Sequence, residues 1–261
     1  MAEVVIVSGE EAAATLVTAA MLELIRRKPD AVVGLATGST PLASYRLLAT
    51  RISDEGLDVS RLRAFALDEY VGLPPQHPQS YRSVITREVT EPLRLTPDLV
   101  HVPSGDPASI EHSAADYETA IRTAGGIDLQ ILGIGRTGHI GFNEPGSSLA
   151  SLTRVKTLAE ATRADNARFF AAAAEVPTHC ITQGIGTILR ARHLLLLAFG
   201  SAKAGAIADA VEGPVSATRP GSAIQLHPHA TVIVDEDAAS QLQLADYYRH
   251  AWNNKPEWQG I

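Results

Sequence analysis

Two periodicities of hydrophobic and polar positions alternate along the chain. Short, mainly apolar runs, typical of strands buried on both faces, occur at 4–7, 31–35, 64–67, 129–132, 194–199 and 231–234. Between the first two runs, the stripe of an amphipathic helix over 10–28 is formed by Val17, Met21, Leu24 and Ile25. The Ala-rich stretch 201–211 predicts a further helix between the last two runs.

Strands separated by helices of this length predict a Rossmann-like α/β fold. Right-handed crossovers would form an open, mostly parallel sheet with helices on both faces. The chain shows no internal repeat and no low-complexity linker, and the Pro-rich stretch 73–78 is too short to divide it. We therefore expect residues 1–261 to form a single domain.

Polar motifs follow four of the predicted strands. They occupy 37–40, 68–69, 133–144 and 200–203. Ligands of open α/β sheets bind beyond the carboxyl ends of the strands, so these segments are expected to converge on one crevice.

Composition and charge argue against several classes of partner and cofactor. A net charge of −7 argues against a nucleic-acid partner. The absence of a signal-peptide pattern and of an 18-residue apolar run predicts a cytoplasmic chain without a membrane partner. The single cysteine, Cys180, excludes a disulfide framework and is expected to be a buried hydrophobe. His227 and His229 lack the companions of a metal motif, so no metal is predicted.

The stretch TGSTP at 37–41 precedes a helical pattern. Its exposed backbone N–H groups and the helix dipole would suit a phosphate, while an ordinary helix cap formed by Ser39 or Thr40 is the alternative. Arg168, and Lys203 after the strand at 194–199, are candidate cations for that phosphate.

Two adjacent carboxylates, Asp68 and Glu69, follow the strand at 64–67. Neighbouring side chains of a strand point in opposite directions, so one carboxylate could face the crevice as a general base while the other faces protein or solvent. The alternative is that both carboxylates lie in solvent at the start of a loop.

Residues 133–147, GIGRTGHIGFNEPGS, contain the G-x-G-x-x-G spacing of a dinucleotide site. A helix should follow the third glycine of such a site, but Gly141 and Pro145 are poor helix formers. Instead, His139 and Glu144 suggest an acid–base pair, with glycines that allow close approach of a ligand. The alternative is a histidine that caps a turn beside a surface glutamate.

Five motifs in this order resemble the glucosamine-6-phosphate deaminase (glucosamine-6-phosphate isomerase) family. They are TGSTP, LDEYVGLPPQHPQSY at 67–81, GIGRTGHIGFNEPGSSLASLTRVKTL at 133–158, RADNARFF at 163–170 and QLHPHATVIVDEDAA at 225–239. The resemblance implies conversion of glucosamine 6-phosphate and water to fructose 6-phosphate and ammonium, in amino-sugar catabolism, without metal or organic cofactor.

The resemblance also implies roles for particular residues. Asp68 would move a proton between C2 and C1 of the open-chain sugar, and His139, oriented by Glu144, would open the pyranose ring. Phosphate would be held by Ser39, Thr40, Arg168 and Lys203. Apart from the resemblance, RADNARFF with the Ala run behind it permits residues 158–180 to form a lid, and this stays open.

Two departures from the family pattern concern the ring-opening relay and regulation. Thr137 stands where the family commonly has an aspartate of the ring-opening relay. Ser147, Arg154, Lys156 and Thr157 match allosteric positions of hexameric members, but Arg249 falls where a tyrosine is expected. The sequence therefore leaves open whether the protein is a monomer or a hexamer.

Three alternative functions stay open beside the deaminase. They are a galactosamine-6-phosphate deaminase, a 6-phosphogluconolactonase-type hydrolase, and a sugar-phosphate sensor of the same fold. Glu144 is expected to distinguish the deaminase from the hydrolase, and the presence of Asp68, His139 and Glu144 favours an enzyme over a sensor.

Overall fold

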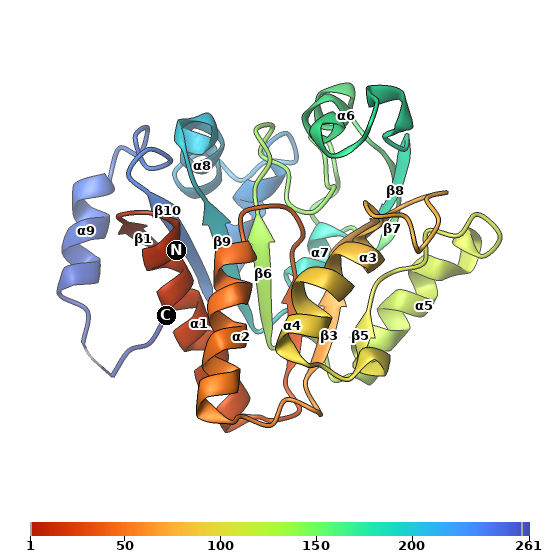
Figure 1. Ribbon diagram of the computed structural model, residues 1–261. Helices are drawn as coiled ribbons and strands as arrows, with labels where there is room; N and C mark the ends of the chain where they lie inside the picture. Colours follow the sequence, from red (N-terminus) through yellow and green to blue (C-terminus); the bar gives the residue numbers. More distant parts are fainter. Residues whose placement is uncertain (1, 257) are drawn as a thin grey trace.

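A seven-stranded, fully parallel sheet forms the centre of the molecule (Figure 1). The computed structural model describes residues 2–256 and 258–261. In spatial order the strands are β1 (Glu3–Val7), β10 (Ala230–Asp235), β9 (His193–Ala198), β6 (Leu129–Gly133), β2 (Val32–Leu35), β3 (Arg63–Ala66) and β5 (Val100–His101). The chain winds outward from β2 toward β5 and from β6 toward β10, so the winding direction reverses between β2 and β6.

A second, three-stranded antiparallel sheet was not expected from the sequence. It contains β4 (Asp68–Tyr70), β8 (His179–Thr182) and β7 (Arg154–Thr157), in that order. The strand predicted at 64–67 is β3, which ends at Ala66, and the chain then enters the second sheet at Asp68. These strands are only three or four residues long, and their pairing depends on segments far apart in the chain.

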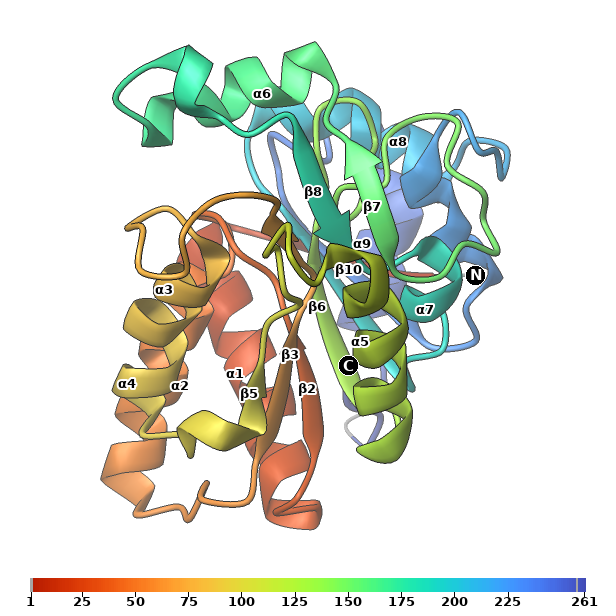
Figure 2. The same ribbon diagram turned by 90° about the vertical axis from the view of Figure 1, so that its right-hand side faces the viewer.

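Helices cover both faces of the large sheet, as predicted. One face carries α1 (Glu10–Arg27), α2 (Leu42–Glu55), α3 (Tyr81–Ile85) and α4 (Glu91–Leu93); the other carries α5 (Ile110–Thr123), α7 (Ile185–Ile188) and α8 (Ala204–Val211) (Figure 2). Helix α9 (Ala245–Asn253) packs beside β1. This arrangement follows from right-handed crossovers that run in opposite directions on the two sides of β2 and β6.

The apolar runs of the sequence form the core. All six residues of β9 are buried, as are Val17, Met21, Leu24 and Ile25 of α1. The single-domain α/β fold and the predicted strands are therefore confirmed. No helix in the described part of the chain is long and apolar enough to cross a membrane.

One segment stands apart from both faces of the sheet. Helix α6 (Glu160–Asn166) lies above the carboxyl ends of the strands, on the connection from β7 to β8 (Figures 1 and 2). We call residues 158–178 the α6 segment. Its underside belongs to a small hydrophobic cluster with Tyr70, Phe142 and Cys180, separate from the main core.

Candidate active site

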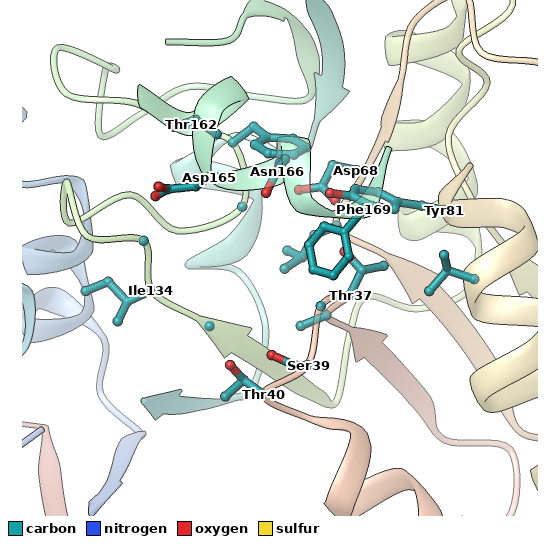
Figure 3. Close-up of a pocket in the computed structure, with 18 of the residues that line it drawn as sticks. Thr37, Ser39, Thr40, Asp68, Tyr81, Ile134, Thr162, Asp165, Asn166 and Phe169 are labelled. Carbon is teal, nitrogen blue, oxygen red and sulfur yellow. The ribbon is translucent and has the colours of Figure 1, made fainter. Parts of the chain in front are cut away.

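A cavity of about 690 Å³ opens at the carboxyl ends of β2 and β6. This is the point where the winding direction reverses, which is where open α/β sheets bind ligands. Figure 3 shows Ser39 and Thr40 on one side of the cavity and Asp68 and Asn166 on the other.

All four polar segments predicted to converge do contribute to the cavity wall. Ser39 and Thr40 follow β2, Asp68 lies in β4, His139 follows β6, and Lys203 lies in the turn before α8. The α6 segment adds further residues to the wall, among them Arg168. Thr137 and Glu144 lie behind His139 rather than at the surface of the cavity.

The two adjacent carboxylates point in opposite directions, as their position in a strand predicts. Asp68 lines the cavity, whereas Glu69 turns away and accepts backbone N–H groups of Tyr70, Tyr81 and Arg82 at 2.8, 2.8 and 2.9 Å. Both residues are 5% exposed, so the alternative of a solvated loop entry was wrong. Glu69 thereby anchors the start of α3, while Asp68 is left to act in the cavity.

The carboxylate of Asp68 accepts no hydrogen bond from any residue that the structure describes. Burial raises its pKa well above the usual range, and the neighbouring charge of Glu69 raises it further. A buried carboxylate without a donor has a raised affinity for a proton. Asp68 is therefore suited to remove a proton from a weakly acidic group in the cavity.

The loop after β6 is not a dinucleotide cradle. No helix begins between Gly133 and Ala159, which excludes the phosphate-binding helix start of that motif. The glycines were expected to make room for a ligand, but a Cβ atom at Gly135 would lie only 2.2 Å from the imidazole of His139. Gly135 thus makes room for His139 itself.

His139, Thr137 and Glu144 form a connected group. Thr137 Oγ1 lies 2.9 Å from His139 Nδ1 and 3.3 Å from Glu144 Oε2, and His139 Nδ1 lies 3.3 Å from Glu144 Oε2. An ionised glutamate only accepts, and a threonine has one proton to donate. The group is satisfied when His139 donates from Nδ1 to Thr137 and Thr137 donates to Glu144, which leaves a lone pair on His139 Nε2.

Glu144 is buried rather than a surface residue, so that alternative was wrong. Burial alone would raise its pKa, but the hydrogen bond and charge of His139, and hydrogen bonds from Thr162 and Thr137, lower it below the usual value. Glu144 is therefore held ionised beside His139. His139 and Glu144 thus lie within 3.3 Å of each other, and their role as an acid–base pair stays a prediction.

Three of the cationic side chains that line the same cavity as the loop at 37–41 form what we call the positive region: Lys203, Arg136 and Arg168. Lys203 Nζ donates to the carbonyl of Ile134 at 2.7 Å, and burial lowers its pKa, with Asp165 opposing this and Arg136 and Arg168 adding to it. Gly38 has a φ of 88°, which lets the loop turn just before α2 begins at Leu42. An anion in the cavity would meet cationic side chains and the start of a helix.

Several cavity residues were not identified from the sequence. Asn166 donates to the hydroxyl of Tyr70 at 2.9 Å, and Arg136 Nε donates to Asp165 Oδ2 at 3.1 Å. Thr162 donates to Glu144 Oε1. The motif RADNARFF contains Asp165 and Asn166, but only the contacts of α6 show which of its polar residues face the cavity.

The remaining predicted positions lie outside the cavity. Ser147 is 2% exposed, Arg154 donates to Asn143 Oδ1 at 2.9 Å, and Lys156 and Thr157 belong to β7. Cys180 is buried, as expected, and burial raises its pKa. Among the residues that the structure describes, no group of three or more histidine, cysteine, aspartate or glutamate side chains is placed to hold a metal ion.

Comparisons with known proteins agree with this geometry. A protein of Bifidobacterium longum named glucosamine-6-phosphate deaminase is 60% identical over 270 residues and covers all of both chains. The structure of a monomeric glucosamine-6-phosphate deaminase is 39% identical, with a TM-score of 0.89 over 92% of this chain and 99% of that one. The 6-phosphogluconolactonase of Trypanosoma brucei, 18% identical with a TM-score of 0.74 over 93% of this chain and 99% of that one, shares the fold. The family described as glucosamine-6-phosphate isomerases/6-phosphogluconolactonase matches residues 8–234, and the chain belongs to it.

Proposed function

We propose that this chain is a glucosamine-6-phosphate deaminase, which converts glucosamine 6-phosphate and water to fructose 6-phosphate and ammonium. The observation that carries the proposal is Asp68, a buried carboxylate that has no hydrogen-bond donor among the described residues and lies on the wall of a cavity that also contains His139. The 60% identity to the Bifidobacterium longum protein of that name supports it.

Ring opening is the task of His139. With Nδ1 donating toward Thr137 and Glu144, Nε2 takes the proton of the sugar's C1 hydroxyl and returns it to the ring oxygen, so that the C1 aldehyde forms. An imidazole suits both transfers at neutral pH. Ionised Glu144 stabilises the positive charge that His139 carries between them.

Isomerisation and deamination follow at C2. Asp68 removes the C2 proton while a proton of the C2 ammonium group passes to O1, which gives an enolamine, and Asp68 then delivers its proton to C1, which yields a protonated imine at C2. Water adds to that imine, and cleavage of the C–N bond with departure of ammonium leaves the ketone of fructose 6-phosphate. The proton transfers in this sequence are ones that positioned side chains can catalyse.

The sugar phosphate binds at the positive region of the cavity. Ser39 and Thr40 contribute hydroxyl and backbone donors, and Arg168 and Lys203 contribute positive charge. Binding energy from this remote group orients C1 and C2 against His139 and Asp68.

The α6 segment is the lid of this site. It contributes Arg168 to the cavity wall, so movement of this segment would change access to the site. The expected lid at 158–180 includes this segment and the start of β8.

The active unit is a monomer, as in the structure of the monomeric deaminase to which this chain is similar. The allosteric role of Ser147, Arg154, Lys156 and Thr157 stays a prediction. Ser147 is buried and Arg154 is engaged by Asn143, so an effector would have to rearrange both.

The experiment that tests the function is ammonium release from glucosamine 6-phosphate. Galactosamine 6-phosphate, unphosphorylated glucosamine and 6-phosphogluconolactone are offered in parallel to the wild type and to Asp68→Asn. We expect ammonium from the glucosamine phosphate, far less from the unphosphorylated sugar, and a loss with Asp68→Asn. If the protein hydrolyses the lactone and releases no ammonium from either amino-sugar phosphate, it is a 6-phosphogluconolactonase-type hydrolase and the deaminase proposal is wrong.

A further inference from the structure

The polar contact between helix α6 and Glu144 has no role in the mechanism derived above. Thr162, which is 4% exposed, donates its hydroxyl to Glu144 Oε1 from the helix above the cavity. Figure 3 shows Thr162, Asp165 and Asn166 along this same helix. We propose that Thr162 is a positioning residue for ring opening, which completes the His139–Glu144 pair only while α6 lies over the cavity. This inference rests on the proposed deaminase function.

Thr162 and the ring-opening residues contact different oxygens of one carboxylate. Thr162 holds Oε1, while Thr137 and His139 each lie 3.3 Å from Oε2. A carboxylate held at both oxygens has a defined rotation about its terminal bond, whereas that torsion is broad when unrestrained. Loss of the Thr162 hydroxyl therefore allows Oε2 to leave its place beside Thr137 and His139.

The hydroxyl of Thr162 also keeps Glu144 ionised. It is one of the donors that lower the pKa of this buried carboxylate against the effect of burial. With α6 displaced, Glu144 would lose this donor, and its proton affinity would rise. Closure of the helix over a substrate thus supplies both the orientation and the charge state of the residue behind His139.

Other contacts hold α6 in place independently of Thr162. Asp165 pairs with Arg136, Asn166 binds the hydroxyl of Tyr70 at 2.9 Å, and Arg163 Nη2 donates to the carbonyl of Val176 at 2.8 Å. Removing the Thr162 hydroxyl therefore leaves the helix attached to the rest of the molecule through Asp165 and Asn166, while the Arg163 bond lies within the α6 segment. Thr162→Ser, which keeps the hydroxyl, provides a matched control.

The test compares Thr162→Val, which keeps the size and β-branch of the side chain, with Thr162→Ser, which keeps the hydroxyl. Loss of a hydrogen bond to a charged group corresponds to a kcat about 10- to 100-fold lower for Thr162→Val, with KM little changed. Thr162→Ser should restore kcat.

A second readout does not depend on turnover. The pKa of Glu144, followed by carbon NMR of its carboxyl group, should rise in Thr162→Val and stay at the wild-type value in Thr162→Ser. Thermal unfolding of each variant shows whether the fold is intact.

The inference is overturned if Thr162→Val leaves both kcat and the pKa of Glu144 unchanged, or if Thr162→Ser, which keeps the hydroxyl, reproduces both changes. An inactive wild type would instead contradict the proposed function, and the NMR titration would still decide whether Thr162 holds Glu144.

Discussion

Asp68 and Glu144 are both nearly buried carboxylates of the same site, yet their surroundings shift their pKa values in opposite directions. Asp68 accepts no hydrogen bond from the described residues, and its pKa is raised by burial and by the charge of Glu69. Glu144 accepts from His139, Thr162 and Thr137, and its pKa is lowered although burial opposes this. The difference teaches that hydrogen-bond donors, more than burial, separate a proton-accepting carboxylate from a permanently charged one.

The largest expected effect comes from removing the proton acceptor. Asp68→Asn keeps the shape of the side chain but cannot take the C2 proton, so kcat should fall about 10²- to 10⁴-fold, the usual contribution of a general base. Ammonium release at saturating glucosamine 6-phosphate measures this. An Asn variant that retained most of the activity would remove Asp68 from the mechanism.

A second variant, Gly135→Ala, displaces His139 from its position beside Glu144. Gly135→Ala places a methyl group where the imidazole of His139 now lies, 2.2 Å from its nearest atoms. The ring must move away from Thr137 and Glu144, and we expect kcat to fall about 10²-fold, the lower range for loss of a general acid–base group. Ala at Gly133, whose Cβ position has nothing within 4 Å, is the matched control and should cost much less. Equal effects at the two glycines would contradict the packing argument.

The raised pKa of Asp68 also has a consequence for stability. A carboxyl group whose pKa is higher in the folded than in the unfolded chain favours folding only in its neutral form. Its penalty is therefore absent below the unfolded value, about pH 4, and grows as the pH rises through the folded value. Asp68→Asn removes that penalty.

Thermal unfolding at several pH values measures this difference. We expect Asp68→Asn to melt at a higher temperature than the wild type at neutral pH, and the gap to close in acid. A gap that stays constant with pH would show that Asp68 is not responsible.

The smallest expected effect concerns Thr137. Thr137→Asp adds a negative charge beside His139 and Glu144, which favours the imidazolium form of His139, so ring opening should require a pH higher by about one unit. Deamination itself should survive. In an Asp68→Asn background, where isomerisation is blocked, exchange between the anomers of glucosamine 6-phosphate followed by NMR isolates ring opening. An unchanged pH profile would mean that position 137 has no electrostatic role.

Much of the fold follows from local sequence pattern. The apolar runs of β1, β2, β3, β6, β9 and β10, and the stripe of α1, were predicted because each is long or apolar enough to show its period. The candidate residues Asp68 and His139 were found because chemistry in α/β folds gathers at strand ends. The small sheet was missed because β7 and β8 have only four residues each, and because β8 also pairs with β4, which lies far away in the sequence.

By itself, the sequence determined the parallel sheet, the family, and the residue types that meet at the carboxyl ends of the strands, because these depend on local periodicity and on motif order. Only the tertiary structure decided which polar groups surround each carboxylate. Among the described residues it left Asp68 without a hydrogen-bond donor, gave Glu144 three donors, and placed Thr162 of α6 among those three. Charge states depend on contacts between residues distant in the chain, and no spacing along the sequence encodes those contacts directly.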